Sequence, residues 1–102
     1  MSASPSIVLR LHANTHGSVL AAADEELIGK TLTEGKISFH VSKTFYFDQK
    51  VNEKEFIEFL SQAGNINLVG ENVIRIAQQQ KMIPLTGGMR ISNVPHVQIY
   101  KI

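Results

Sequence analysis

The sequence contains no cysteine among its 102 residues. This absence excludes disulfides, thiolate nucleophiles and cysteine-based zinc sites, and it fits a reducing compartment. Long hydrophobic runs are also missing, since every apolar stretch is far shorter than the ~20 residues that cross a bilayer. The first six residues carry no basic segment, and Arg10 and His12 interrupt the apolar stretch after them, so a signal peptide is not expected. We therefore expect a cytoplasmic protein without a membrane segment.

No charge of one sign predominates, because 10 Lys and Arg residues against 9 Asp and Glu residues give a formal net charge of +1. Non-specific binding of nucleic acid depends on many phosphate contacts from Lys and Arg, so the whole molecule has no strong attraction to nucleic acid. Glycine and proline are not in excess, and no repeats or linkers are found. A chain of this length forms one hydrophobic core, so we predict a single domain over residues 1–102.

Alternation of apolar and polar residues predicts strands in the first half of the chain. Residues 6–12 form the first strand, and turn residues lead into a second strand that ends near Asp24, so the two are expected to form a hairpin. Residues 24–30 then predict a single helical turn or tight loop that stops at Gly29. A third strand is predicted over residues 37–42, followed by the aromatic cluster 44–47.

Two helices are predicted in the second half. Asn52 can cap the first helix through Glu55, with Val51 packing on Phe56, and Gly64 ends this helix. The second helix is predicted to begin at Asn67 or Gly70 and to continue to Lys81, because its apolar residues recur at helical spacing. Those residues are Val69, Val73, Ile76 and Ala77. Pro84 prevents its continuation, 86–88 form a turn, and residues 89–91 and 96–100 are predicted as strands.

This order of elements indicates an α+β fold, with a mainly antiparallel sheet of about five strands and two helices packed on one face. The opposite face of the sheet is expected to stay uncovered. The predicted core consists of Ile7, Leu9, Leu11, Ile37, Phe39, Val41, Phe56, Ile57, Leu60, Val73, Ile76, Val97 and Ile99.

Polar side chains mark the predicted uncovered face: Arg10, His12, Ser38, His40, His96, Gln98 and Tyr100. Three histidines on one face suggest a metal site, but none of the ligand spacings of zinc or iron sites is present. We therefore predict no metal site and no cofactor. Solvated strand residues are the better interpretation of His12 and His40.

His96 is the strongest single candidate, because Pro95 fixes the backbone just before the imidazole. The structural alternative is an edge strand in which proline blocks pairing. As a general acid or base His96 needs a partner within hydrogen-bond reach, and no residue near it in the sequence supplies one. Should its only partners prove to be backbone groups, an enzymatic role would lose its one acid–base group.

Three further segments are weaker candidates. Gly29-Lys30-Thr31 matches only the end of a phosphate-binding loop, and a helix end followed by a solvated lysine explains it better. A basic series with Phe45 and Tyr46 inside it has the composition that binds single-stranded nucleic acid, although interleaved acidic residues largely cancel its charge. Its members are Lys30, Lys36, Lys43, Lys50 and Lys54. Gly70-Glu71-Asn72 lies near a helix start and could bind an anion, but Glu71 would occupy the positive end itself.

Four blocks together resemble an archaeal family, domain-of-unknown-function family four-twenty-four: residues 26–30, 45–46, 67–71 and 94–98. Members usually have glycine where Asn93 and Phe47 stand, and often cysteine where Ala23 stands, which argues against a thiol role here. We expect Asn93 to keep the turn, because asparagine tolerates left-handed backbone conformations. The resemblance implies an archaeal cytoplasmic protein with no established activity, and a gene neighbourhood of translation factors.

Our leading hypothesis is a non-enzymatic binding module in or near translation, with the ribosome, an RNA or a translation protein as partner. The alternative is a small enzyme or ligand-binding protein that uses His96 and Gln98 with Lys30 or Glu26, which requires these residues to converge in one pocket. A homodimer through the C-terminal strand is a third possibility. The candidate binding residues are Lys30, Tyr46, Glu71, Asn93, His96 and Gln98.

Overall fold

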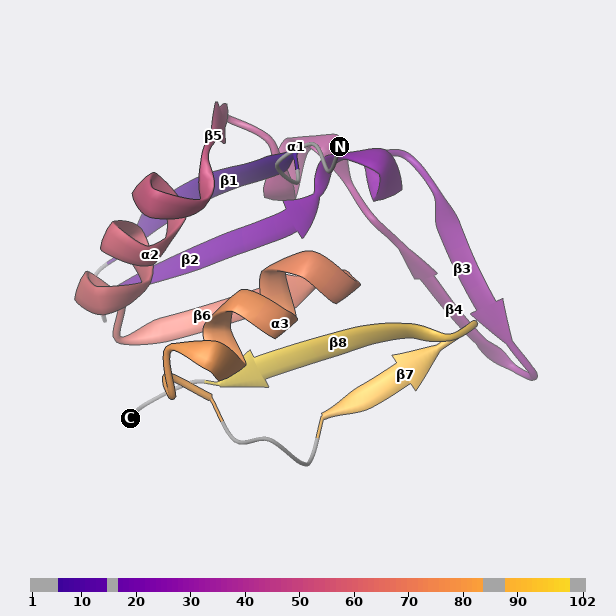
Figure 1. Cartoon of the computed structure of the whole chain (residues 1–102). Coiled ribbons are helices and arrows are strands. Elements are labelled where there is room, and N and C mark those ends of the chain that lie inside the picture. Colours follow the sequence, from indigo (N-terminus) through magenta and orange to yellow (C-terminus); the bar gives the residue numbers. More distant parts are fainter. Residues whose placement is uncertain (1–5, 15–16, 84–87, 100–102) are drawn as a thin grey trace.

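Two helices pack against one face of a mixed sheet, and a separate hairpin extends beside the end of that sheet (Figure 1). The computed structural model describes residues 6–14, 17–83 and 88–99. The main sheet has, in spatial order, β5 (Gln49–Val51), β1 (Ile7–Asn14), β2 (Gly17–Asp24), β6 (Asn65–Val69), β8 (Val94–Ile99) and β7 (Met89–Ile91). The remaining elements are η1 (Glu25–Leu27), β3 (Thr31–Glu34), β4 (Ile37–His40), α1 (Lys43–Tyr46), α2 (Glu53–Gln62) and α3 (Glu71–Gln79).

All pairs of the main sheet are antiparallel except β2 with β6, which is parallel. The predicted α+β class with a mostly antiparallel sheet is confirmed, as is the packing of α2 and α3 on the same face. The described residues give this sheet six strands rather than about five, because β5 and β6 were not predicted and the predicted third strand lies outside it.

Several local predictions are confirmed. The first two strands pair as a hairpin, from Asn14 opposite Gly17 to Ile7 opposite Asp24. One turn of 3-10 helix follows, and Gly29 takes the left-handed conformation at φ +86°. Helix α2 carries a complete capping box, in which the Asn52 side chain accepts from the Glu55 amide and the Glu55 carboxylate accepts from the Asn52 amide.

The prediction for the segment before α3 was wrong. Residues 65–69 are the strand β6 rather than the start of a helix, and α3 begins only after Gly70, whose φ of +124° is incompatible with helix. A short apolar run that is buried on both faces has no alternation, so its pattern cannot be distinguished from helix. This strand supplies the parallel pairing with β2.

The prediction that the third strand belongs to the main sheet was also wrong. β4 pairs with β3 in its own two-stranded hairpin and not with the main sheet. Three of the four β3 residues are exposed, so the strand lacks the alternating apolar pattern that would have indicated it. Ile37, predicted in the core, is 49% exposed on this hairpin. The aromatic segment after it forms the single helical turn α1.

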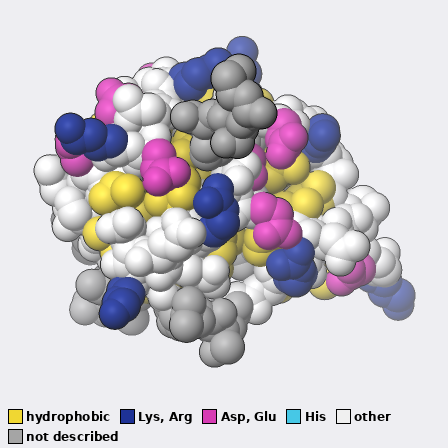
Figure 2. Space-filling model, in the orientation of Figure 1, with side chains coloured by type: hydrophobic (Ala, Val, Ile, Leu, Met, Phe, Trp, Pro, Cys, Tyr) yellow, Lys and Arg dark blue, Asp and Glu magenta, His cyan; other side chains and the backbone are white. Residues whose placement is uncertain are grey.

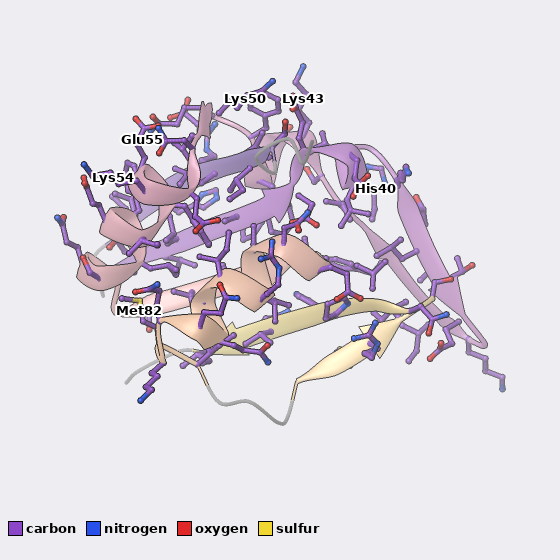
Figure 3. All side chains as sticks on the ribbon, in the orientation of Figure 1. His40, Lys43, Lys50, Lys54, Glu55 and Met82 are labelled. Atoms are coloured by element: carbon purple, nitrogen blue, oxygen red, sulfur yellow. The ribbon has the colours of Figure 1, made fainter. Side chains whose placement is uncertain are left out.

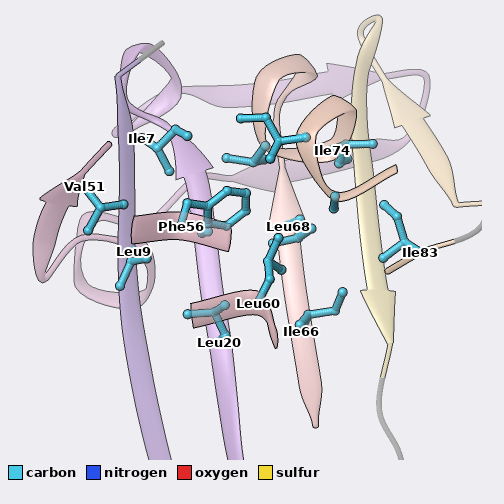
Figure 4. Packing of buried hydrophobic residues seen from close by; sticks show 14 residues of the cluster. Ile7, Leu9, Leu20, Val51, Phe56, Leu60, Ile66, Leu68, Ile74 and Ile83 are labelled. Atoms are coloured by element: carbon cyan, nitrogen blue, oxygen red, sulfur yellow. The ribbon is translucent and has the colours of Figure 1, made fainter. Parts of the chain in front are cut away.

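The main core lies between the sheet and the helices α2 and α3 (Figure 4). Phe56 of α2 lies over β2 and Leu60 lies between β2 and β6, whereas Ile74 of α3 lies over β6 and β8. Nine of the predicted core residues belong to this cluster or pack against it: Ile7, Leu9, Phe56, Ile57, Leu60, Val73, Ile76, Val97 and Ile99. Leu11 does not, because it is 50% exposed on the last part of β1.

The face expected to be uncovered is instead covered by a second cluster. Val8, Ala21 and Ala23 on this face are fully buried beneath Leu27, Leu32, Val41 and Tyr46. The small side chains of β2 leave room for the bulky residues of α1 and the hairpin to approach the sheet. Phe39 and Val41 therefore do contribute to a core, but on the face opposite the predicted one. No helix in the described part of the chain is long and apolar enough to span a membrane.

Candidate functional site

A chain of buried polar side chains crosses the second face of the sheet. His96 on β8 lies between Val69 of β6 and Met89 of β7, and is only 4% exposed. Its Nε2 atom lies 3.1 Å from Oδ1 of Asn67, to which the Tyr46 hydroxyl donates a hydrogen bond of 2.7 Å. We call these three residues the Tyr46–Asn67–His96 network. Two predicted site residues, Tyr46 and His96, are thus brought together through Asn67.

The hydrogen bonds determine which nitrogen of His96 carries the proton. Asn67 Oδ1 has two lone pairs, so it accepts from Tyr46 and from an Nε2–H of His96 at the same time. The amide nitrogen of Gln98 lies 3.2 Å from the same Nε2. Because Nε2 carries the proton, we assign the Gln98 amide the opposite orientation, with its carbonyl oxygen toward the ring. Nδ1 of His96 has no hydrogen-bond partner among the described residues, which leaves its lone pair as an acceptor.

Aromatic rings enclose the network. Phe39 of the hairpin stacks on the His96 ring at a centroid distance of 4.6 Å and meets Tyr46 edge-on at 6.5 Å. Burial lowers the pKa of His96 below its ordinary value, because the imidazolium would lose its hydration. His96 is therefore neutral at pH 7. From the sequence, an acid–base role for His96 required partners other than backbone groups alone. His96 meets this requirement, because its imidazole contacts the side chains of Asn67 and Gln98.

One edge of His96 opens into a depression of about 380 Å³ lined by Gly88, Met89, His96 and Gln98, which we call the His96 depression. Met89 is 50% exposed and Gln98 is also exposed, so both are accessible to a partner. Among the described residues that line it, no side chain carries a permanent charge.

The other histidines do not join this site. His12 stacks on Phe45 and its Nε2 lies 2.7 Å from the Phe45 carbonyl oxygen. His40 is exposed on the β3–β4 hairpin, where Nδ1 meets the Thr31 hydroxyl (Figure 3). The expected common face of three histidines is therefore wrong, because the hairpin lies outside the main sheet. Tyr100 lies outside the described residues, among which no three His, Asp or Glu side chains gather to hold a metal ion.

The N-terminus of α3 is occupied from another part of the chain. Asp24 at the end of β2 accepts from the backbone amides of Asn72 and Val73 and from the Asn72 side chain. Burial raises the pKa of Asp24 in spite of these hydrogen bonds, which favour the carboxylate. Glu71, expected at this position, instead forms an exposed ion pair with Arg90.

Arg90 brings Glu71 and Asn93 together. Its Nη2 donates to Glu71 Oε1 at 2.6 Å and to the Asn93 carbonyl oxygen at 2.7 Å. Asn93 has φ of +66°, so it adopts the left-handed turn conformation expected where the family has glycine. These groups lie around the β7–β8 turn and are exposed, which favours a role in holding the turn.

Lys30 and Glu26 stand apart from His96. Lys30 is exposed after η1, and Glu26 lines a different depression, of about 440 Å³, with Ser6, Asp24, Glu25 and Asn72. The members of the basic series do not form one cluster: Lys43, Lys50 and Lys54 point outward along α1, β5 and α2 (Figure 3). Lys50 is paired with Glu25 at 3.0 Å.

Sequence reasoning missed three residues that organise these sites: Asp24, Phe39 and Asn67. Asp24 was predicted as the end of a strand and the start of a helical turn, Asn67 as a helix start, and Phe39 as a core residue. A signal was available for Asn67, since a lone amide inside the apolar run 66–69 needs a buried partner.

Comparisons with known proteins place the chain in a family without giving it an activity. A crystal structure of an uncharacterized conserved protein from Methanopyrus kandleri matches with a TM-score of 0.78 and 25% identity, covering 93% of this chain and 90% of that one. No curated protein matches this chain. The family model described as "Protein of unknown function (DUF424)" matches residues 11–102. The chain therefore belongs to this family.

Proposed function

We propose that the chain is a non-enzymatic binding module that acts in or near translation and contacts its partner at the His96 depression. The observation that carries this proposal is a built polar site without catalytic partners. Within the described residues His96 bonds only to Asn67 and Gln98, and neither amide can serve as a nucleophile, acid or base. Exposed Met89 and Gln98 beside it supply apolar and polar contact area.

The proposed connection with translation comes from the family resemblance, because that resemblance implies a gene neighbourhood of translation factors. The partner we favour is RNA with a small footprint. Charges of both signs alternate over the face that carries α2 and α3 (Figure 2), so this face has no continuous basic stripe for a nucleic acid backbone. With a formal net charge of +1, few phosphate contacts are expected.

Co-sedimentation with ribosomal subunits tests this function. Tagged full-length protein is sedimented from native lysate at low and moderate salt, with and without ribonuclease. We expect nuclease-sensitive sedimentation with one subunit and a shallow salt dependence, because the slope reports the number of phosphates contacted. The Gln98→Glu variant should sediment less, whereas Gln79→Glu, the same change at an exposed position of α3, should behave as wild type.

Each other outcome has a definite meaning. Sedimentation that resists ribonuclease would replace RNA by a protein partner, and a steep salt slope would contradict the small footprint. Protein that stays in the supernatant under every condition would overturn the translation module.

A small enzyme or ligand-binding protein is the second candidate, and the free Nδ1 of His96 favours it. This function required His96 and Gln98 to share one pocket with Lys30 or Glu26. Only half of that grouping is present, because Gln98 lies beside His96 but Glu26 lines another depression. A screen of metabolites against wild type and His96→Ala would support this function if a compound binds only the wild type and is chemically changed. Binding without turnover would favour the module.

A further inference from the structure

The His96 depression suits an uncharged group. The lining residues that the structure describes are Gly88, Met89, His96 and Gln98, and none of them carries a carboxylate, ammonium or guanidinium group. A charged ligand group placed there would lose hydration without gaining an ion pair, which is unfavourable. The volume of about 380 Å³ is at the small end of ligand sites, so the depression takes a single compact group.

The polar groups at the edge of the His96 depression provide one hydrogen-bond acceptor and one neighbouring donor. The Nε2–H of His96 is held by Asn67, so the Nδ1 lone pair is available as an acceptor. In the orientation assigned to it above, the exposed Gln98 amide presents its N–H groups as donors. The complementary ligand edge has an N–H next to a carbonyl oxygen or a ring nitrogen, and the edges of all nucleobases carry such a pair.

The apolar component fits a flat ring. Met89 is 50% exposed next to His96, and a thioether packs favourably against aromatic rings. Phe39 and the Tyr46–Asn67–His96 network hold the imidazole in place, so the acceptor is fixed before a ligand arrives. Such preorganisation reduces the entropy lost on binding.

We propose that the His96 depression binds one unstacked nucleobase by its hydrogen-bonding edge, either in a nucleoside or in single-stranded RNA. The assignment rests on the proposed function, because it names the chemical group that this module takes from its partner.

Nuclear magnetic resonance of the ¹⁵N-labelled full chain tests the assignment. The protein is titrated with adenosine, cytidine, guanosine and uridine, and with single-stranded RNA octamers of each base. We expect shifts of the His96 imidazole nitrogens and of the Gln98 side-chain amide with at least one nucleoside. Tighter binding of the matching octamer would identify RNA as the source, and equal affinity would identify the free nucleoside.

Gln98→Glu is the diagnostic variant, because its carboxylate is acceptor-only and lacks the donor that the ligand edge requires. We expect affinity to fall about tenfold, as for the loss of a hydrogen bond worth 1.4 kcal/mol. Gln79→Glu makes the same change on exposed α3 and should bind as wild type. Backbone spectra that match wild type show that both variants are folded.

Three results would overturn the assignment. These are no shift at His96 or Gln98 with any nucleoside or octamer, equal affinities of the two variants, and shifts that occur only with a small peptide amide used as comparator. The last would assign the depression to a peptide group. Co-sedimentation distinguishes this failure from a failure of the proposed function. If the protein sediments with a ribosomal subunit but binds no base, the nucleobase assignment is wrong and the translation module still stands.

Discussion

At the scale of single residues, the buried polar side chains carry most of the information about function. Asp24, Asn67 and His96 are the buried polar residues in the described part of the chain. Within that part, every side-chain nitrogen or oxygen atom that is itself cut off from solvent has a hydrogen-bond partner. Asp24 has a structural role, since it caps α3. Asn67 and His96 hold each other beside a depression, and a polar pair in a sheet interior costs stability that an apolar pair would not.

Gly70 is the residue where a methyl group should be most harmful. A Cβ atom built there lies 2.5 Å from Cγ of Asp24 and under 3 Å from both carboxylate oxygens, and the backbone has φ of +124°. We expect Gly70→Ala to lower the free energy of unfolding by about 3 kcal/mol, measured by urea denaturation. Gly64→Ala is the control, because nothing lies within 4 Å of its added Cβ. Equal stability of the two variants would contradict the close approach of Asp24 to α3.

His96 should make the protein less stable in mild acid. Its pKa is lowered by burial, so between the ordinary value of 6.5 and the folded value the unfolded chain binds a proton that the folded chain does not. The stability contributed above pH 6.5 is therefore lost as the pH falls through that window. Urea denaturation across this range should show the loss in wild type and in His40→Gln but not in His96→Gln. A loss that persists in His96→Gln would assign the effect to another group.

At the scale of elements, prediction succeeded where the signal is local. Helix α2 was predicted with its cap, because Asn52 and Glu55 satisfy each other within one turn. Strand β6 was assigned to a helix, because its buried apolar run has no alternation and its neighbours β2 and β8 lie far away in the sequence. The same reason explains why β4 was placed in the main sheet, since alternation indicates a strand but not its partner.

The β3–β4 hairpin should control the pKa of His96. Phe39 covers one face of the imidazole, so Phe39→Ala should let water reach the ring and move its pKa back toward the ordinary value. Loss of this partly buried ring should also lower the free energy of unfolding by about 2 kcal/mol. A ¹⁵N titration of the imidazole measures the first effect and urea denaturation the second.

Ile37→Ala on the same hairpin is the matched control, because Ile37 is 49% exposed. It should leave both quantities nearly unchanged. An imidazole titration that is the same in wild type and Phe39→Ala would mean that the hairpin does not shield His96.

At the scale of the whole molecule, the predicted homodimer depends on how much of β8 is free. β6 pairs with β8 from Ile66 to Val69 along one side, and β7 pairs only with Val94 to His96 on the other. Residues 97–99 therefore have no strand partner on that second side within the described part of the chain. Tyr100, which ends the predicted edge, lies outside the described residues.

A dimer through this stretch stays a prediction, and sedimentation velocity over a range of concentrations tests it. We expect wild type to dimerise with rising concentration and Val97→Lys to remain monomeric, because two lysines would meet across the twofold axis. Val97 packs partly against the main core, so circular dichroism must show that the variant is folded. Monomeric wild type at every concentration would rule out this dimer, and a dimer of folded Val97→Lys would place the interface elsewhere.

By itself the sequence determined what depends on near neighbours: the β1–β2 hairpin, the capped helix α2, the turn at Gly29 and the α+β class. These features follow from alternation, helical spacing and capping within a few residues. Only the tertiary structure joined Tyr46 to Asn67, His96 to Asn67 and Asp24 to Asn72, across 21, 29 and 48 residues. The reason is physical, since such contacts form when distant strands pair in one register, and no single segment encodes that register.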